Sequence, residues 1–137
     1  MKISTKFFGE IELEDSQIIT FKRGIPGFEN EKKFVLLDIE DTNFKCIQSI
    51  NDKDVCLLLI SPWDYIKDYE IELSDEEIKE LELTSHEQVM VYNVVTIREN
   101  KITANFLAPI IINIINNNGK QIILTDSKYS IRQEIKC

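Results

Sequence analysis

The feature that most constrains this chain is the length of its apolar runs, which are short and separated by turn residues. Residues 34–39, 44–50 and 55–60 are three such runs, divided by Thr42-Asn43 and by the polar segment 51–54. Short runs rich in β-branched and aromatic residues, bounded by turn residues, are typical of consecutive antiparallel strands. Many short strands predict an all-β fold, either a sandwich or a small barrel.

The same pattern continues on both sides of these three runs. Residues 10–14 alternate polar and apolar side chains, and residues 17–21 form a second β-rich run. Pro26-Gly27 suits the centre of a type II turn, where the second position needs a positive φ. In the C-terminal half we predict strands at residues 88–97, 102–106, 110–115 and 121–125. Turns are expected at residues 99–101 and at Asn118-Gly119, and residues 127–136 form either a last strand or a loose tail.

One segment has the pattern of a helix. Ser74 is a good N-cap, and Glu77 completes a capping box three residues later. Leu73 and Ile78 can form a hydrophobic staple around this start. We therefore predict one short helix over residues 75–83, with Ile78 and Leu81 facing inward.

Size and charge narrow the function classes. The chain has 137 residues, which fits one domain spanning 1–137. Its net charge is −8, from 16 Lys and Arg against 24 Asp and Glu, and this balance opposes direct nucleic-acid binding. The acidity either attracts a basic partner or only maintains solubility. The longest apolar runs are too short to span a bilayer, and no secretory segment follows Met1, so we expect a cytoplasmic protein without a membrane partner.

Motifs for catalysis, metals or cofactors are missing from the sequence. The chain has a single histidine, His86, and no Gly-x-Ser-x-Gly or phosphate-loop motif. Its three cysteines form no Cys-x-x-Cys pair, so we expect Cys46 and Cys56 to be buried apolar residues and Cys137 to be exposed. We therefore expect no enzyme activity, no metal and no cofactor. A small β-barrel hydrolase using His86 stays as a competing hypothesis.

Three sets of segments, in order, resemble the FliW family of flagellar assembly factors. The first set comprises residues 5–11, 18–21 and the Gly-Ile-Pro-Gly-Phe-Glu motif at 24–29. The second comprises residues 34–37, 44–49 and Ser61-Pro62, and the third comprises 103–113 and 119–124. One departure is Cys46, which stands where the family is expected to have a bulky aromatic residue.

The resemblance implies a small closed or near-closed antiparallel β-barrel-like domain with one short helix, monomeric when free. It also implies a non-enzymatic protein that binds flagellin in the cytoplasm and antagonises CsrA, an RNA-binding translational repressor. Accumulating flagellin would occupy such a protein and release CsrA, which then represses flagellin synthesis. A generic acidic chaperone or adaptor with another client is the alternative.

The partner surface is expected at the turn 24–29 and the strand 44–49. Ile25 and Phe28 are large apolar residues in or beside a turn, where exposed apolar groups often bind partners. Phe28 could equally close one end of the barrel from inside. Asn105 could bind a partner or hydrogen-bond the chain near Pro109. The predicted partner-binding residues are Ile25, Phe28, Glu29, Phe44, Gln48 and Asn105.

Overall fold

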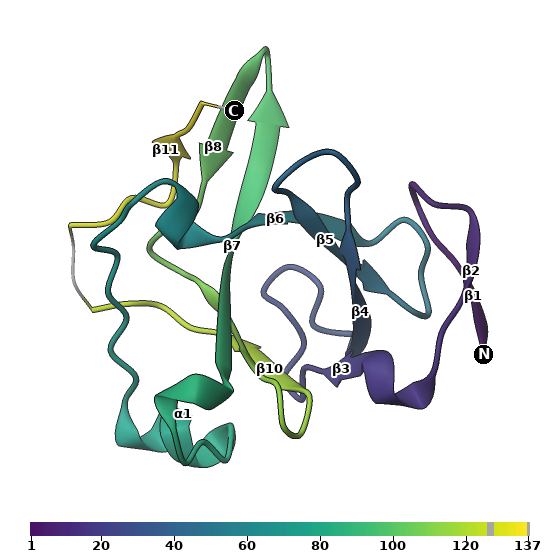
Figure 1. Ribbon diagram of the computed structural model, residues 1–137, viewed down its shortest axis with the longest axis horizontal. Coiled ribbons are helices and arrows are strands. Elements are labelled where there is room, and N and C mark those ends of the chain that lie inside the picture. The colour runs from purple at the N-terminus through teal and green to yellow at the C-terminus, as the bar shows by residue number, and fades with distance from the viewer. Residues whose placement is uncertain (126–127, 137) are drawn as a thin grey trace.

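The computed structural model describes residues 1–125 and 128–136 and consists mainly of short strands (Figure 1). In order, the strands are β1 (Lys2–Ser4), β2 (Glu10–Glu12), β3 (Ile18–Thr20), β4 (Lys33–Asp38), β5 (Lys45–Ser49), β6 (Cys56–Ile60), β7 (Val89–Arg98), β8 (Lys101–Ala104), β9 (Ile110–Asn113), β10 (Asn118–Gln121) and β11 (Gln133–Glu134). One α-helix, α1 (Asp75–Glu80), and three single-turn 3-10 helices, η1 (Asp15–Gln17), η2 (Pro62–Asp64) and η3 (His86–Gln88), complete the described elements.

Seven of these strands close into a barrel. The order β7-β6-β5-β4-β3-β10-β9 returns to β7, because the first half of β7 pairs with β9 and the second half pairs with β6 and β8. All pairs are antiparallel except β3–β10, which is parallel and joined at Thr20 and Asn118. Figure 1 shows this ring in cross-section. The predicted all-β barrel with one short helix is confirmed, with one parallel pair in an otherwise antiparallel arrangement.

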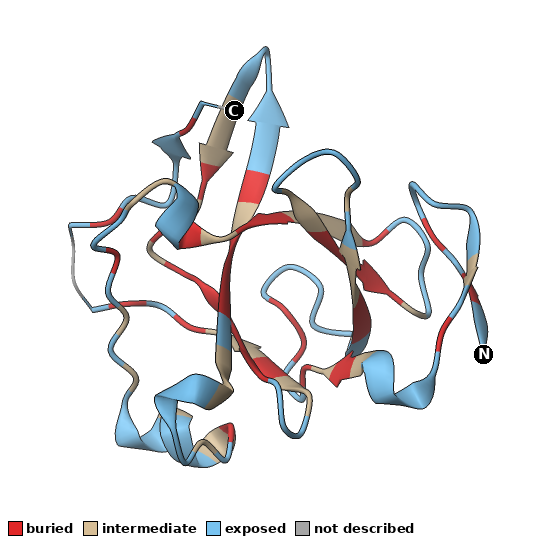
Figure 2. Ribbon diagram, in the orientation of Figure 1, coloured by how far each residue is buried: buried red, intermediate tan, exposed pale blue. Residues whose placement is uncertain are grey.

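Buried residues are concentrated on the strands that form the ring, as the colouring of Figure 2 shows. Alternate residues of β3, β4, β5, β6, β7 and β9 point inward and form one cluster with Ile25 and Val55. Phe21 and Phe34 are fully buried there and meet edge to face, with their ring centroids 5.4 Å apart. The barrel is therefore a packed core without a central channel.

Two further apolar clusters cover the outside of the barrel. The hairpin of β1 and β2 packs Ile3 and Leu13 against Val35 of β4. On the opposite side, the outward residues Val91 and Val95 of β7 contact the C-terminal segment and the chain around α1. Because the strands are buried on both faces here, they read as continuous apolar runs in the sequence.

The helix begins as predicted and ends early. The Ser74 hydroxyl accepts a hydrogen bond from the Glu77 N–H at 3.1 Å, and the Glu77 carboxylate accepts one from the Ser74 N–H at 2.9 Å. The helix ends at Glu80, and Glu82 follows with a φ of 56°. Leu81 is buried as expected, whereas Ile78 is 37% exposed, so its inward placement was wrong. A helix of six residues has little more than one turn inside its caps, and only its C-terminal end reaches the core.

Two predicted turns are confirmed and a third is wrong. Gly27 has a φ of 92°, and the Phe28 N–H donates to the Ile25 carbonyl at 2.7 Å. Glu99 and Asn100 both have positive φ and connect β7 to β8. In the third case the turn lies at residues 114–117, while Asn118 and Gly119 begin β10.

Gly119 is required there for space. A Cβ atom at Gly119 would lie 2.6 Å from Cζ of Phe21, so the strand can approach the ring only because this residue has no side chain. The glycine that looks like a turn residue in sequence is therefore a contact with the barrel core.

Other predictions are settled by burial and pairing. Cys46 is buried and Cys56, the first residue of β6, is only half-buried; both thiols are free. Within the predicted segment 127–136, Gln133–Glu134 pairs with β8 as a short strand. Ser127 and Cys137 lie outside the described residues. Among the helices of the described chain, none combines the length and the apolar character needed to cross a membrane.

Candidate partner-binding site

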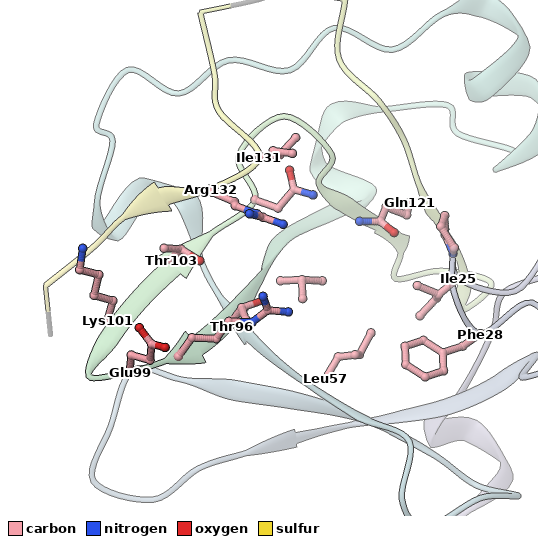
Figure 3. A pocket seen from close by; sticks show the side chains of 14 residues that line it. Ile25, Phe28, Leu57, Thr96, Glu99, Lys101, Thr103, Gln121, Ile131 and Arg132 are labelled. Atoms are coloured by element: carbon pink, nitrogen blue, oxygen red, sulfur yellow. The ribbon is translucent and has the colours of Figure 1, made fainter.

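The barrel has a hollow at one end, with a volume of about 450 Å³, which we call the mouth. Figure 3 shows the side chains around it. They come from the turn at Ile25, from β6, from both strands of the β7–β8 hairpin, from Gln121 and from the C-terminal segment. The mouth therefore joins parts of the chain that are more than 100 residues apart in sequence.

The length of β7 explains why a hollow forms here. β7 has ten residues and β6 only five, so the β7–β8 hairpin continues beyond the ring (Figure 1). Along β7, the residues on the inward face are Val94, then Thr96 and then Arg98. They become more polar towards the end of the strand because that end extends beyond the ring, where no facing strand can bury them. On β8 the matching positions are Lys101 and Thr103.

The floor of the mouth is apolar. Ile25 is 2% exposed at its base, beside Leu57 and Val94. Phe28 lies at the edge of this floor and is 37% exposed (Figure 3). Phe28 therefore does not close the barrel from inside but presents apolar surface at its end, and its role as a partner contact stays a prediction.

The rim of the mouth is basic. Arg98 and Lys101 are directly opposite each other in the β7–β8 ladder, and Arg132 reaches the same rim from the C-terminal segment. All three are exposed, and none has an ion pair within 4 Å among residues 1–125 and 128–136. Glu99, in the turn between β7 and β8, is the one carboxylate among the described residues that line the hollow.

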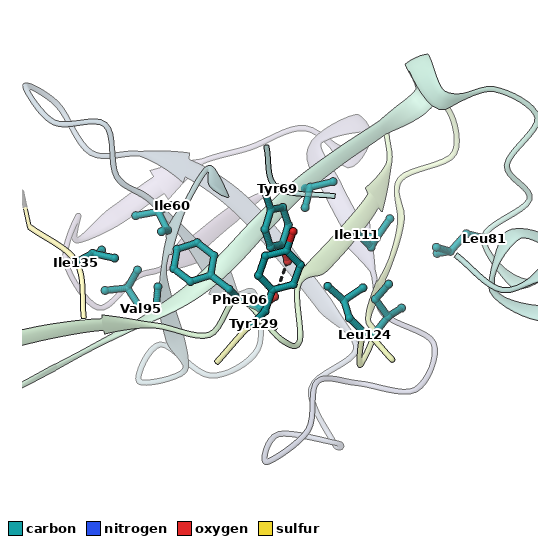
Figure 4. Close-up of a cluster of buried hydrophobic side chains, with 12 residues drawn as sticks. Ile60, Tyr69, Leu81, Val95, Phe106, Ile111, Leu124, Tyr129 and Ile135 are labelled. Carbon is teal, nitrogen blue, oxygen red and sulfur yellow. Dashed lines mark hydrogen bonds between the residues drawn. The ribbon is translucent and has the colours of Figure 1, made fainter. Parts of the chain in front are cut away.

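A second hollow, about 550 Å³ in volume, lies between β7 and the chain around α1, and we call it the Trp63 groove. Trp63 is 44% exposed, and its indole N–H donates to the Tyr69 carbonyl at 3.0 Å. Tyr69 in turn donates to the Phe106 carbonyl at 2.6 Å, in the outer core shown in Figure 4. His86 lines this groove, and the hydroxyl of the adjacent Ser85 accepts the Glu87 N–H.

The helix beside this groove is fixed to the barrel through Glu80. Its carboxylate accepts from Nζ of Lys120 at 2.7 Å and from Nε of Arg23 at 2.9 Å. The hydrogen bond from Lys120 lowers the pKa of Glu80, and the charges of Lys120 and Arg23 lower it further. The ion pairs hold α1 against β10 and the segment before the Ile25 turn.

The structure brings three of the six predicted site residues together and separates the others. Ile25, Phe28 and Asn105 line the mouth. The Glu29 carboxylate accepts the Gly27 N–H at 2.7 Å and so stabilises the turn beside it. Phe44 lies away from the mouth, immediately before β5, where it lines a separate hollow with several acidic residues.

Gln48 has no exposed surface, which contradicts its placement among partner contacts. Its side chain is 0% exposed beneath the N-terminal hairpin. Its Oε1 accepts the Lys6 N–H at 3.0 Å, and its Nε2 donates to the carbonyls of Ser49 and Lys53. Gln48 therefore links β5 to the N-terminal hairpin and to the turn that follows β5.

Asn105 has the structural role that was one of its two readings. Its Oδ1 accepts the Ala108 N–H at 3.0 Å, which fixes the chain immediately before Pro109. Asn105 is half-buried and also lines the mouth. Its hydrogen bond therefore fixes the backbone that forms part of this hollow.

Sequence reasoning missed the basic rim and Trp63. Arg98 and Lys101 flank a two-residue turn, and residues in that relation are opposite each other on one face of a hairpin. That register was readable from the sequence once the turn was recognised. Arg132 and Trp63 had no such pattern, because tertiary packing alone brings them to their hollows.

The fold and its hollows define the class: a small, filled β-barrel with apolar grooves on its surface. The family model described as FliW protein matches residues 2–135. The flagellar assembly factor FliW of Clostridium tetani is 45% identical, with all of both chains covered, and that of Geobacillus sp. (strain WCH70) is 42% identical over 98% of this chain and 95% of its own. A crystal structure of the flagellar assembly factor FliW superimposes with a TM-score of 0.94 at 41% identity, covering 100% of this chain and 98% of that one. The chain belongs to the FliW family of flagellar assembly factors.

Proposed function

We propose that this chain binds flagellin in the cytoplasm and antagonises the translational repressor CsrA through protein–protein binding, without catalysis. Membership of a family of flagellar assembly factors supports a flagellar protein as partner. CsrA is proposed as the second partner because the resemblance to the FliW family implies it. The free protein is a monomer in this proposal.

The observation that carries the flagellin-binding part of the proposal is the composition of the mouth. Protein interfaces commonly have an apolar centre and a polar rim. The mouth has Ile25, Leu57 and Val94 on its floor, Phe28 at the edge of that floor, and charged side chains around it. A few large side chains, often aromatic, contribute most of the binding energy at many interfaces, and Phe28 is the aromatic residue among the described residues that line the mouth.

Switching between the two partners follows from mass action. When two partners exclude each other, the fraction bound to each depends on its concentration relative to its dissociation constant. Newly made flagellin would therefore displace CsrA as it accumulates, and export of flagellin would reverse the exchange.

The experiment is a pull-down with purified flagellin and CsrA, separately and mixed, using the wild type, Phe28→Ala and Phe7→Ala. Phe7 is 66% exposed in the N-terminal hairpin and does not line the mouth, so it is a matched control. We expect the wild type and Phe7→Ala to retain both proteins, and Phe28→Ala to lose at least one. Circular dichroism and urea unfolding establish that the variants are folded. Failure of the wild type to retain either protein would overturn the proposal.

A further inference from the structure

We propose that the mouth is a recognition site for carboxylate side chains, and that it takes an acidic segment with an adjacent apolar residue from flagellin. Arg98, Lys101 and Arg132 contact the carboxylates, and the apolar floor takes the neighbouring side chain. This inference rests on the proposed function for the identity of the partner, although the chemistry of the site can be tested without it.

The first support is a pair of like charges in the β7–β8 ladder. Arg98 and Lys101 are directly opposite each other in the register, and both line the mouth. Side chains at opposed positions have Cβ atoms about 5 Å apart, and like charges there are destabilising. Arg132 adds a third positive charge to the same rim. An anion bound between them would remove this repulsion.

The second support is that the rim cations have no internal partner. In the described part of the chain, Arg98, Lys101 and Arg132 have no carboxylate within 4 Å, so all three charges are available to an incoming anion.

The third support comes from the groups between the rim and the floor. Thr96 and Thr103 are opposite each other on the inner face of the hairpin, and neither hydroxyl hydrogen-bonds to another described residue. They are available as donors to a carboxylate that enters the rim. Below them lie Val94 and Leu57, which suit an apolar side chain.

The arrangement favours acidic side chains within a segment over a single chain terminus. The cations come from two separate parts of the chain, the β7–β8 hairpin and the C-terminal segment (Figure 3). Three charges spread around an open rim match more than one carboxylate, whereas a chain terminus supplies only one. CsrA binds RNA, and such proteins have basic surfaces that this rim would repel. Flagellin is therefore the partner assigned to the mouth.

A substitution at Glu99 should change flagellin affinity in the opposite direction to the arginine substitutions. Glu99 is exposed on the same turn as Arg98 and competes with an incoming carboxylate for the rim charges. Glu99→Gln keeps a similar shape at this positive-φ position and removes the competing charge. We expect it to tighten flagellin binding.

The test is the dissociation constant of the flagellin complex at low and high salt, measured by calorimetry. The double variant Arg98→Gln/Arg132→Gln should weaken binding about tenfold or more at low salt and reduce the salt dependence, because charge-assisted contacts are lost. Lys53→Gln/Lys67→Gln changes the net charge equally, at exposed positions outside the mouth, and should leave the constant within about twofold of the wild type. CsrA binding should be unaffected by the mouth variants. Two results would overturn the inference while leaving the proposed function intact. In the first, Arg98→Gln/Arg132→Gln binds flagellin as tightly as the wild type; in the second, this variant keeps flagellin binding and loses only CsrA binding.

A direct probe covers the case in which flagellin does not bind at all. Acetyl-Leu-Glu-Leu amide should shift the NMR signals of Thr96 and Thr103, and acetyl-Leu-Gln-Leu amide should not. If neither peptide shifts these signals, the site does not recognise carboxylates. If acetyl-Leu-Leu with a free C-terminus shifts them more strongly than the glutamate peptide, the assignment to acidic side chains is wrong.

Discussion

Gly119→Ala tests how closely β10 is packed on the barrel core. In an extended strand without strain, replacing glycine by alanine stabilises a protein by about 0.5–1 kcal/mol, because the unfolded chain loses freedom. Here the new Cβ would lie 2.6 Å from Cζ, 2.8 Å from Cε2 and 3.0 Å from Cε1 of Phe21. The ring is 0% exposed and packs edge-on against Phe34, so it has little room to move.

The expected cost follows from these two terms. Overpacking a filled core typically costs about 1–3 kcal/mol, which exceeds the gain from the lost glycine. We expect Gly119→Ala to lower the free energy of unfolding by about 1–2 kcal/mol, measured by urea denaturation at neutral pH.

The double variant Gly119→Ala/Phe21→Leu identifies the cause. Leucine lacks the three ring atoms that the new Cβ would meet, so the clash disappears while the cost of the smaller side chain remains. The same Gly119→Ala change should therefore be neutral or stabilising in the Phe21→Leu background. A coupling energy below about 0.5 kcal/mol between the two positions would refute the packing account.

Two further predictions concern buried polar side chains. Gln48→Leu should lower the free energy of unfolding by about 2–3 kcal/mol in urea denaturation, because it leaves the Lys6 N–H and nearby carbonyls without a partner. If this variant is instead as stable as the wild type but binds its partners less well, Gln48 is a contact residue after all. Burial raises the pKa of Tyr69 to about 12, from 10 in the unfolded chain. The unfolded chain therefore loses this proton first, and stability should fall as the pH rises from about 10 towards 12. The alkaline decrease in the free energy of unfolding should be smaller in Tyr69→Phe than in the wild type, and equal decreases would contradict this assignment.

Local patterns determined which parts of the fold could be predicted. The capping box at Ser74 and the turn at Pro26-Gly27 depend on a few consecutive residues, and both are present in the structure. Asn118-Gly119 was misread because a hairpin glycine and a glycine beneath a distant ring look alike in sequence. Phe21 and Gly119 come together only when β3 pairs with β10 and closes the barrel, and no local sequence pattern predicts that pairing.

The candidate site was predictable in part for the same reason. Ile25 and Phe28 are linked by one local turn, and the structure places both at the mouth. Gln48 was misplaced because its partner, the Lys6 N–H, is 42 residues away. Arg132 joins the rim through the folded C-terminal segment, and nothing near it in sequence indicates that position.

The parallel contact between β3 and β10 governs when the barrel can close. It joins Thr20 to Asn118, and the Asn117 side chain adds a hydrogen bond to the Ser16 carbonyl at 2.6 Å. Until residue 118 leaves the ribosome, the nascent chain can form only an open, curved sheet with unpaired strand edges. Exposed edges of this kind promote pairing between chains. A chain interrupted before β10 would therefore be expected to aggregate, and completion of synthesis is also the step that removes this hazard.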